Sequence, residues 1–358
     1  MSVEDLVEQP LNPWMMGGGE EGDIVLSSRI RLARNLEGIP FPNRADAGQL
    51  AAVVAEMKNS VTDLNHMNPE KPERYEFAEL DKFSALERYV LVEKHIISPN
   101  HAQQPDNRAI IIRNDAAVSI MVNEEDHLRI QCLASGLNLT EALFMANRID
   151  DALEAKCSFG FNEKVGYLTA CPTNLGTGLR ASVMAHLPAL ALTKQINRIV
   201  NAATQLGLTV RGLYGEGTEA VGNIFQISNQ LTLGYAEKEI IENLSSVVRQ
   251  VVDHERNARN VLLSESEEAL SDRVWRAYGL LRYARSISGQ EALAKLSEVR
   301  LGIDLGIINE APASIFNELL VTTRPNYLQK LAGARQDEPI ERDRLRALII
   351  REKLAEAK

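Results

Sequence analysis

The chain has little cysteine and no excess of positive charge. Its 358 residues include three cysteines, widely spaced and odd in number, with no Cys-x-x-Cys pair. This pattern argues against a disulfide framework and against a cysteine-based zinc site. Lysine and arginine number 39 against 49 acidic residues, a formal net charge of −10. Since general nucleic-acid binders usually carry a basic excess, we expect no direct nucleic-acid partner.

Targeting and membrane-spanning segments are also absent from the sequence pattern. The first residues, MSVEDLVEQPLNPW, lack the basic stretch and apolar core of a signal peptide. No apolar run approaches the 18 or so residues that a membrane helix needs. No internal repeat of 20 to 50 residues is evident. We therefore expect a cytoplasmic protein with reduced cysteines and no membrane contact.

Apolar residues change their spacing along the chain in a way that separates helices from strands. Residues 1–23 are predicted as loop. Helices are predicted over residues 46–62, 84–97, 140–156 and 179–206, the last of these ending at Gly207. Strands are predicted over residues 109–113, 118–122, 128–132, 208–213 and 224–228.

From residue 236 onward, only helical spacing remains. The order predicts an α+β fold, an antiparallel sheet flanked by helices and followed by an all-α C-terminal domain. We place a catalytic domain at residues 1–258 and a helical domain at residues 259–358, with the option that one helix runs through the boundary. The C-terminal helices are predicted over residues 236–262, 266–286, 290–300, 312–320 and 339–357.

Arginine is prominent in four segments that are polar where a fold would favour apolar residues, namely 27–35, 123–129, 171–182 and 211–219. Arg29 and Arg31 alternate with apolar residues, so on a strand both guanidinium groups point to one face. A guanidinium is a planar fork of donors that fits two phosphate oxygens. Several together can clamp a nucleotide and stabilise a transferring phosphoryl group. The candidate clamp is Arg29, Arg31, Arg129, Arg180 and Arg211.

Two glutamates and a glycine-rich turn accompany these arginines. Glu125 and Glu216 supply negative charge from two segments, which suits a cationic acceptor that they orient and relieve of a proton. Gly176, Gly178 and a helix beginning at Leu179 are expected to add backbone donors for phosphate.

Each of these features alone has a simpler interpretation. A single arginine is more often a partner in a surface ion pair, and a single cysteine is more often a small buried residue. The chain has no GxxxxGK[ST] run and no GxGxxG run after a strand, so neither a P-loop nor a dinucleotide fingerprint is present. The residues alone indicate a nucleotide-linked enzyme and no more.

Together, the four segments resemble the catalytic domain of the phosphagen (guanidino) kinases. The runs SSRIRLARN, VNEEDHLRI, CPTNLGTGLRASV and RGLYGEGTEAVGNIFQISNQLTLG follow that family's order within about residues 20–255. The resemblance implies ATP with Mg²⁺ as phosphoryl donor and a guanidinium as acceptor. It implies that Glu125 is the principal catalytic carboxylate, with Glu216 as its partner. Cys171 would tune the acceptor guanidinium without forming a covalent intermediate.

The resemblance also implies a set of ATP-binding residues and no metal site built by the protein. The set combines the arginine clamp with its neighbours in the sequence and with a histidine in the stretch 92–96. It consists of Ser27, Ser28, Arg29, Ile30, Arg31, His95, Arg129, Arg180, Ala181, Ser182, Val183, Met184, Arg211, Gly212, Leu213, Tyr214 and Gly215.

The chain departs from the small-guanidine kinases in its domain order. A helical domain precedes the arginine motif in those enzymes, whereas here that motif begins at residue 27 and a helical region follows the catalytic one. Tyr214 stands where the family usually has an arginine. These features resemble the bacterial protein arginine kinases, whose acceptor is an arginine side chain of another protein.

A C-terminal run, Arg342-Asp343-Arg344-Leu345-Arg346-Ala347, matches the RDxxRA motif of those kinases. The resemblance implies an activating phosphoarginine-binding pocket made by Arg342, Asp343, Arg346 and Ala347. Arg342 and Arg346 are four residues apart, about one helical turn. A charged, solvated helix face is the alternative interpretation.

The resemblance further implies a role in stress response and protein quality control. Substrate proteins with accessible arginines would be marked for a Clp ATPase and protease, and a heat-shock repressor would be inactivated. A zinc-finger-type activator protein and a homodimer are also implied. Two alternatives stay open, a kinase of free arginine or another small guanidino compound, and a non-catalytic phosphoarginine-binding adaptor.

Overall fold

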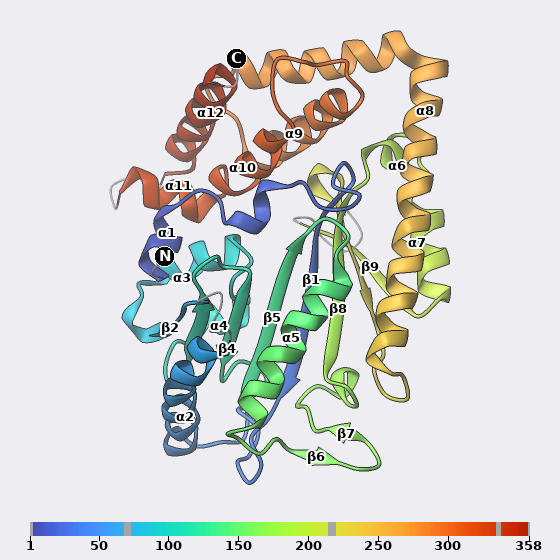
Figure 1. Cartoon of the computed structure of the whole chain (residues 1–358). Coiled ribbons are helices and arrows are strands. Elements are labelled where there is room, and N and C mark those ends of the chain that lie inside the picture. The colour runs from blue at the N-terminus through green and yellow to red at the C-terminus, as the bar shows by residue number, and fades with distance from the viewer. Residues whose placement is uncertain (1–2, 68–72, 214–219, 334–337, 357–358) are drawn as a thin grey trace.

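A single sheet forms the frame of the molecule. The computed structural model describes residues 3–67, 73–213, 220–333 and 338–356. Within these residues, eight antiparallel strands pair in the order β2-β3-β4-β5-β1-β8-β10-β9 (Figure 1). They are β1 (Val25–Arg34), β2 (Tyr75–Glu79), β3 (Ala109–Arg113), β4 (Val118–Val122), β5 (Leu128–Ser135), β8 (Leu179–His186), β9 (Leu208–Gly212) and β10 (Ile224–Asn229). The short strands β6 (Phe161–Asn162) and β7 (Gly166–Tyr167) pair separately.

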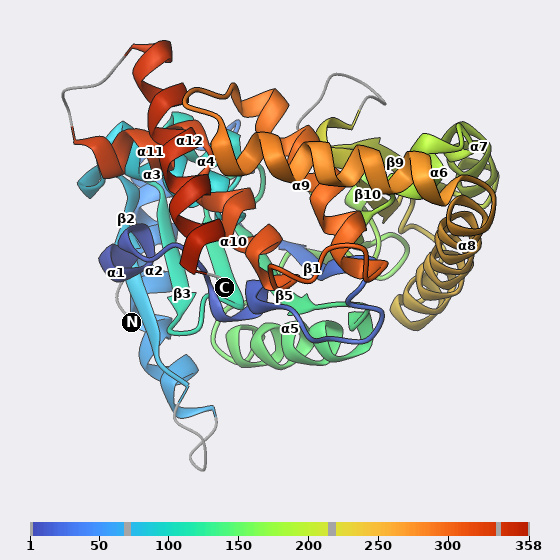
Figure 2. The same cartoon turned by 90° about the horizontal axis from the view of Figure 1, so that it is seen from above.

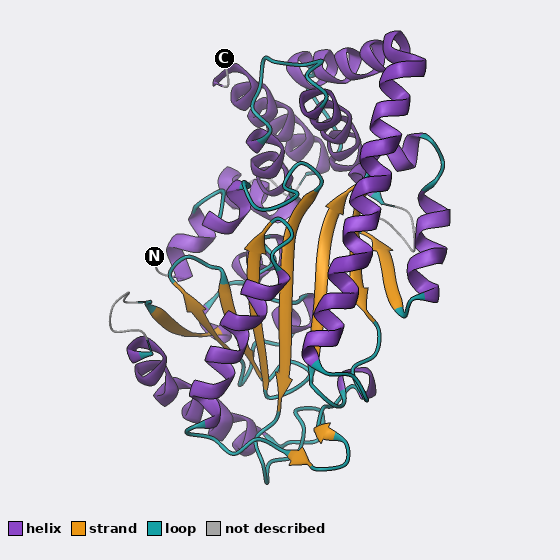
Figure 3. Ribbon diagram, turned by 45° about the vertical axis from the view of Figure 1, so that its right-hand side comes forward, coloured by secondary structure: helices purple, strands orange, loops and turns teal. Residues whose placement is uncertain are grey.

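One face of the sheet is covered by α2 (Ala47–His66), α5 (Leu139–Glu154) and the first part of α8 (Glu237–Tyr283) (Figure 3). Alternate residues of the central strands, such as Ile30 and Val183, join these helices in one hydrophobic core. Burial of these side chains fixes the register of the strands, because a shift by one residue would expose the whole apolar set.

On the opposite face, a group of N-terminal helices lies toward β3 and β4. There α1 (Val3–Glu8), α3 (Ala85–Glu93) and α4 (Pro99–Gln103) lie beside the strands, and most of their buried apolar residues join Ile110, Ile112 and Met121 in a second core. The residues of β1, β8 and β10 on this face are mostly polar, and they line the site described below.

The C-terminal helices gather at one end of the sheet (Figures 1 and 2). They are α9 (Gly289–Asp304), α10 (Ser314–Thr322), α11 (Pro325–Ala332) and α12 (Pro339–Glu356). The long helix α8 turns sharply toward them, and its helical geometry is interrupted at Ser266, with φ −146° and ψ 32°. The second part of α8 packs with α9, α10 and α12 in a separate hydrophobic core. The proposed domain boundary between residues 258 and 259 lies inside α8, so this boundary stays a prediction.

The predicted α+β class is confirmed, as are the strands expected at 109–113, 118–122, 128–132, 208–213 and 224–228, within a few residues. The helix expected over 179–206 is wrong. That stretch forms β8, then α6 (Pro188–Leu192) and α7 (Ile196–Gln205). Its first part alternates buried apolar residues with polar ones and pairs with β1 and β10, so strand pairing overrides its helical propensity.

Other differences are smaller. The predicted helix at 84–97 ends at Glu93, since His95 has a φ of +59° that a helix does not allow. The predicted loop over residues 1–23 contains α1, and the sequence reading missed β2 and α11. No helix in the described part of the chain is long and apolar enough to cross a membrane.

Candidate active site

Strand register gathers the predicted arginines on the partly open face of the sheet. Arg31 of β1 lies directly opposite Arg180 of β8, and Ala33 lies opposite Arg129 of β5. Since opposite residues of paired strands point to the same face, these side chains converge. In the next strands, Gln226 of β10 lies opposite Arg211 of β9 and continues the same surface.

These side chains line one open pocket with a cavity volume of about 340 Å³. The pocket brings together all five predicted clamp arginines with Glu125 and Cys171. Gln226 also lines it, and the sequence reading missed that residue. The lining residues are Arg29, Arg31, Ala33, Glu125, Arg129, Cys171, Thr173, Asn174, Gly178, Arg180, Arg211 and Gln226.

The pocket concentrates positive charge. Burial, with Arg129 and Arg180 nearby, lowers the pKa of Arg29 to about 10. Burial and the neighbouring arginines also place the pKa of Arg31 well below its usual range, and burial and Arg211 lower that of Arg180. Because neighbouring cations repel one another, the pocket favours a multiply charged anion.

Neutral partners orient two of these arginines. Arg29 donates from Nε to Ser182 Oγ at 3.2 Å and from Nη2 to Gln226 Oε1 at 2.9 Å. Arg180 donates to Ser228 Oγ at 3.3 Å. These bonds aim the guanidinium groups without neutralising them, so their charge stays available for phosphate.

Glu125 enters the pocket from the turn between β4 and β5. Its Oε2 lies 3.1 Å from Nη2 of Arg129, and its side chain is 41% exposed. Burial raises the pKa of Glu125 despite the opposing effect of Arg129. A carboxylate that is reachable from the pocket and whose pKa is raised is suited to accept a proton.

Glu124, to which the sequence analysis assigned no role, has a supporting position. It is buried, pairs with Nη1 of Arg129 at 2.8 Å and accepts hydrogen bonds from Ser98 Oγ and from the Glu125 backbone N–H. Although burial acts in the other direction, Arg129 and these hydrogen bonds hold the pKa of Glu124 below its ordinary value. Glu124 thus stays ionised and orients Arg129.

Asp126 ties the Cys171 segment to this turn. Its Oδ1 accepts from Asn35 Nδ2 and from the Ala170 backbone N–H, both at 2.7 Å. Asn35 follows β1, so this one carboxylate fixes the end of β1, the Glu125 turn and the approach to Cys171 together. The Cys171 thiol lies 3.0 Å from Thr173 Oγ1 at the pocket wall. Asp126 and Asn35 were not predicted as site residues.

Four of the predicted ATP-binding side chains lie on the other face of the sheet. They alternate with pocket residues along β1 and β8 and are buried toward the α5 side, with Ser28 bonded to Gly136 and Asn138 there. Their side chains therefore do not line the arginine pocket, and the assignment of these positions to ATP binding stays a prediction. These four are Ser28, Ile30, Ala181 and Val183.

The predicted helix N-terminus at Leu179 is also wrong, because Leu179 begins β8. Gly178, with a φ of +68°, instead lets the Cys171 segment approach β1. A Cβ at this position would lie 2.6 Å from the Ala33 carbonyl oxygen. The glycine therefore allows close backbone contact rather than forming the start of a phosphate-binding helix.

A second, mainly apolar pocket adjoins the first along the same face. Ser27 and Met184, two residues beyond Arg29 and Ser182 on their strands, line it with His95. Burial, Arg29 and Arg324 lower the pKa of His95 to about 3, so its imidazole is neutral. The N-terminal segment and α10 supply the remaining wall, consisting of Trp14, Met15, Leu26, Asn317, Leu320 and Val321.

The structure describes only part of the predicted site segment 211–219. Tyr214, Gly215 and Glu216 lie outside the described residues. Gly212 ends β9, and Leu213 packs against the core of the C-terminal helices rather than lining the arginine pocket.

The RDxxRA run lies on α12. Arg346 is buried, pairs with Asp343 and donates to the backbone carbonyls of Thr323 and Ile287 at 2.9 and 2.8 Å. Ala347 is buried in the C-terminal core, while Arg342 and Asp343 are partly exposed. The structure thus brings Arg346 and Asp343 together, and Arg346 joins α12 to the chain just before α9.

Known proteins match this chain over nearly its whole length. The family "ATP:guanido phosphotransferase, C-terminal catalytic domain" matches residues 56–258, and "Protein-arginine kinase McsB C-terminal domain" matches residues 267–358. The protein-arginine kinase of Symbiobacterium thermophilum is 52% identical over 355 residues, covering 99% of this chain and 100% of that protein. That of Bacillus subtilis is 50% identical over 354 residues, covering 99% and 96%. The chain belongs to the protein-arginine kinase family.

Solved structures place the fold among the phosphagen kinases. Lombricine kinase is 28% identical with a TM-score of 0.57, over 68% of each chain. The duplicated taurocyamine kinase of Schistosoma mansoni is 26% identical with a TM-score of 0.58, over 76% of this chain and 42% of that one. The protein is thus a kinase of the ATP:guanido phosphotransferase type, as the sequence predicted.

Proposed function

We propose that the protein transfers the γ-phosphoryl group of ATP to arginine side chains of other proteins. The observation that carries this proposal is the convergence of five arginines with Glu125 in one pocket. Similarity over almost the full length to curated protein-arginine kinases supports a protein arginine as acceptor. The same similarity disfavours free arginine as acceptor and a non-catalytic adaptor.

The arginines are proposed to bind the phosphates of ATP. These guanidinium groups lie on neighbouring strands and are already oriented, with few negative groups beside them. Their side chains therefore need little rearrangement when the phosphates bind. In the transition state they stabilise the charge on the transferring phosphoryl oxygens. The adjoining apolar pocket beside Ser27, His95 and Met184 is the candidate site for the base.

Glu125 is proposed to orient the acceptor guanidinium and to take its proton. Deprotonation is needed because a free guanidinium, with a pKa above about 12, is a poor nucleophile. The nitrogen then forms a bond to the γ-phosphorus as the bond to the β-phosphate oxygen breaks, and ADP leaves. Glu216 is the proposed second carboxylate, and Cys171, at the pocket wall, is proposed to tune the acceptor.

The residues present fit a Mg²⁺ ion that arrives with the nucleotide. Among the described residues, no group of three or more His, Cys, Asp or Glu side chains could hold a metal ion. Mg²⁺ would therefore be held mainly by the phosphate oxygens of ATP and by water. When bound, Mg²⁺ neutralises phosphate charge.

We also propose the finer roles that the family resemblance implies. These are a place in the stress response, marking of proteins for a Clp protease, inactivation of a heat-shock repressor and activation by a zinc-finger-type partner. A homodimer in the cytoplasm is part of the same proposal. For the RDxxRA run we propose phosphoarginine binding, with the partly exposed Arg342 and Asp343 as the contact residues.

A Glu125→Ala variant tests the proposed mechanism. We expect it to abolish phosphotransfer to protein while ATP binds nearly as tightly as to the wild type, measured by calorimetry. Glu141→Ala, which removes an exposed glutamate from α5, serves as the matched control and should keep full activity. Parallel loss of ATP binding would instead give Glu125 a metal-binding or structural role.

A further inference from the structure

The described residues on either side of the segment that carries Glu216 lie next to each other. We call them the stem: Leu213 before the segment, and Val221–Asn223 with Ile224 after it. The segment follows Leu213 at the end of β9 and precedes Val221–Asn223, which lead into β10. The Leu213 N–H donates to the Ile224 carbonyl at 2.9 Å and holds the two ends together. Any contact that fixes Asn223 and Ile224 therefore fixes both ends of this segment.

The stem belongs to the core of the C-terminal helices. Ile224 is completely buried in that core, and Leu213 and Val221 pack against it. Phe225 and Ile227, which follow in β10, instead join the core between the sheet and α5. At the stem, Ile224, the first residue of β10, thus packs among the C-terminal helices.

Helix α9 contacts the backbone of the stem directly. Gly222 has a φ of +73°, and a Cβ there would lie 3.1 Å from the carbonyl oxygen of Leu293 on α9. Asn223 has a φ of +54°, a left-handed conformation that asparagine tolerates better than most residues. The turn is therefore shaped to lie against α9.

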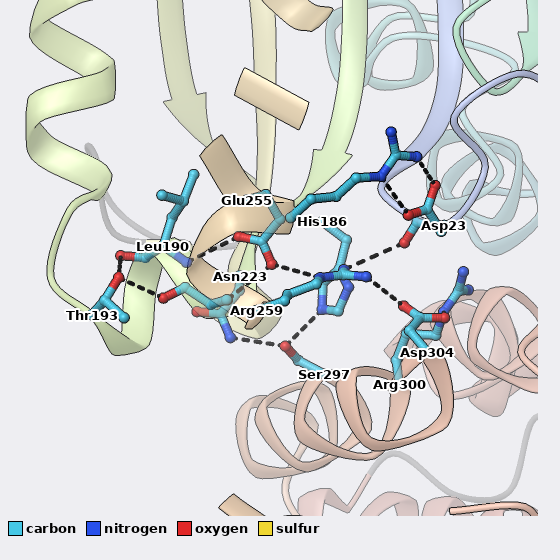
Figure 4. Close-up of polar contacts among 12 residues, drawn as sticks. Asp23, His186, Leu190, Thr193, Asn223, Glu255, Arg259, Ser297, Arg300 and Asp304 are labelled. Carbon is cyan, nitrogen blue, oxygen red and sulfur yellow. Dashed lines mark hydrogen bonds and ion pairs between the residues drawn. The ribbon is translucent and has the colours of Figure 1, made fainter. Parts of the chain in front are cut away.

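Ser297 of α9 joins this turn to the sheet (Figure 4). Its completely buried hydroxyl accepts a hydrogen bond from Asn223 Nδ2 at 2.8 Å and lies 2.8 Å from His186 Nε2. His186 ends β8, the strand that carries Arg180 into the pocket. The next residue, Leu187, donates its N–H to the Asn223 carbonyl at 2.9 Å.

Buried charges hold α9 in place around this contact (Figure 4). Arg300 of α9 pairs with Asp304 at 2.7 Å, and Arg259 of α8 lies between Asp304 and Glu255. Glu255 in turn accepts the first backbone N–H groups of α6, those of Ala189 and Leu190. Because α9 is fixed by this network, it can serve as a rigid support for the stem.

We propose that Ser297 is a positioning residue for phosphotransfer, which holds the stem of the Glu216 segment and the end of β8 at a fixed separation. The inference rests on the proposed role of Glu216 as second carboxylate. It makes the C-terminal helices part of the machinery that sets active-site geometry. Ser297 touches neither nucleotide nor acceptor and acts only through Asn223 and His186.

Ser297→Ala in the full-length chain tests this proposal. A displacement of about 1 Å in a reacting group can cost about 100-fold in rate, so we expect kcat for protein phosphorylation to fall about 10- to 100-fold. The dissociation constant for ATP should stay within about twofold, since the arginine clamp remains. The matched control is Ser288→Ala, which removes the N-terminal cap of the same helix but no contact with the stem. It should lower the melting temperature yet keep kcat.

A second variant, Asn223→Gly, keeps the left-handed turn and removes the amide. If the two residues act through their shared hydrogen bond, the double variant should be about as slow as either single one. The inference would be overturned if the kcat losses of the two single variants multiplied in the double variant. It would also be overturned if Ser297→Ala and Ser288→Ala had equal kcat. Failure of the wild type to form phosphoarginine would instead refute the proposed function, so the two failures are distinguishable.

Discussion

The ion pair of Glu124 with Arg129 offers a test of whether the arginine pocket binds phosphate. The two side chains are 4% and 13% exposed, and their charged atoms lie 2.8 Å apart. Glu124→Gln keeps the shape and most hydrogen bonds but removes the negative charge. Arg129 then remains among Arg29, Arg31 and Arg180 with less compensation.

The expected cost follows from that geometry. Removing one partner of a buried ion pair costs about 3–5 kcal/mol, and because glutamine can still accept from Ser98 and Glu125, we expect about 2–3 kcal/mol. For a chain of 358 residues, this loss corresponds to a melting temperature about 3–4 °C lower. Phosphates bound to Arg129 would replace the lost charge, so a saturating non-hydrolysable ATP analogue should reduce the deficit to below about 1 kcal/mol.

Thermal unfolding with and without the analogue measures both quantities. The control is Glu79→Gln, which weakens an exposed ion pair with Lys82 and should cost below about 1 kcal/mol whether or not nucleotide is present. A Glu124→Gln deficit that the analogue leaves unchanged would refute the reasoning, because Arg129 would then not contact the phosphates.

Three further predictions concern neighbouring groups. Arg31→Gln should raise the melting temperature of the free protein by relieving repulsion and weaken binding of the ATP analogue at least about tenfold; unchanged affinity would remove Arg31 from the clamp. Arg34→Met, which breaks the buried pair with Asp150, should cost about 3–5 kcal/mol of stability with analogue affinity within about threefold, and a large affinity loss would contradict a structural role. Glu125 must be ionised to accept a proton, so kcat should fall as the pH drops through a pKa above the ordinary 4.5, and an acid limb below 4.5 would contradict that role.

Much of the fold can be predicted from the spacing of apolar residues. A strand that buries one face carries an apolar residue at every second position. Arg29 and Arg31 could be placed on one face from that period alone, and the structure confirms it. The stretch beginning at Leu179 carries the same period, yet its leucine, alanine and methionine content also suits a helix. Pairing with β1 and β10 decides the outcome, and that pairing is a long-range effect which local spacing does not contain.

The supporting residues of the site were harder to predict for a related reason. Glu124 and Glu125 are chemically identical neighbours, and only the turn between β4 and β5 turns one toward Ser98 and the other into the pocket. Similarly, Arg346 looks like a surface arginine in the sequence, whereas the structure engages it with two backbone carbonyls. Motif residues were identified by type, but their separate roles depend on tertiary contacts.

Phosphotransfer from γ-labelled ATP, with Mg²⁺, to an unfolded arginine-containing protein and in parallel to free arginine is the most direct test of the central claim. The account predicts label on the protein, removed by acid as an N–P bond would be, and none on free arginine. Label on free arginine alone, or acid-stable label on the protein, would contradict it.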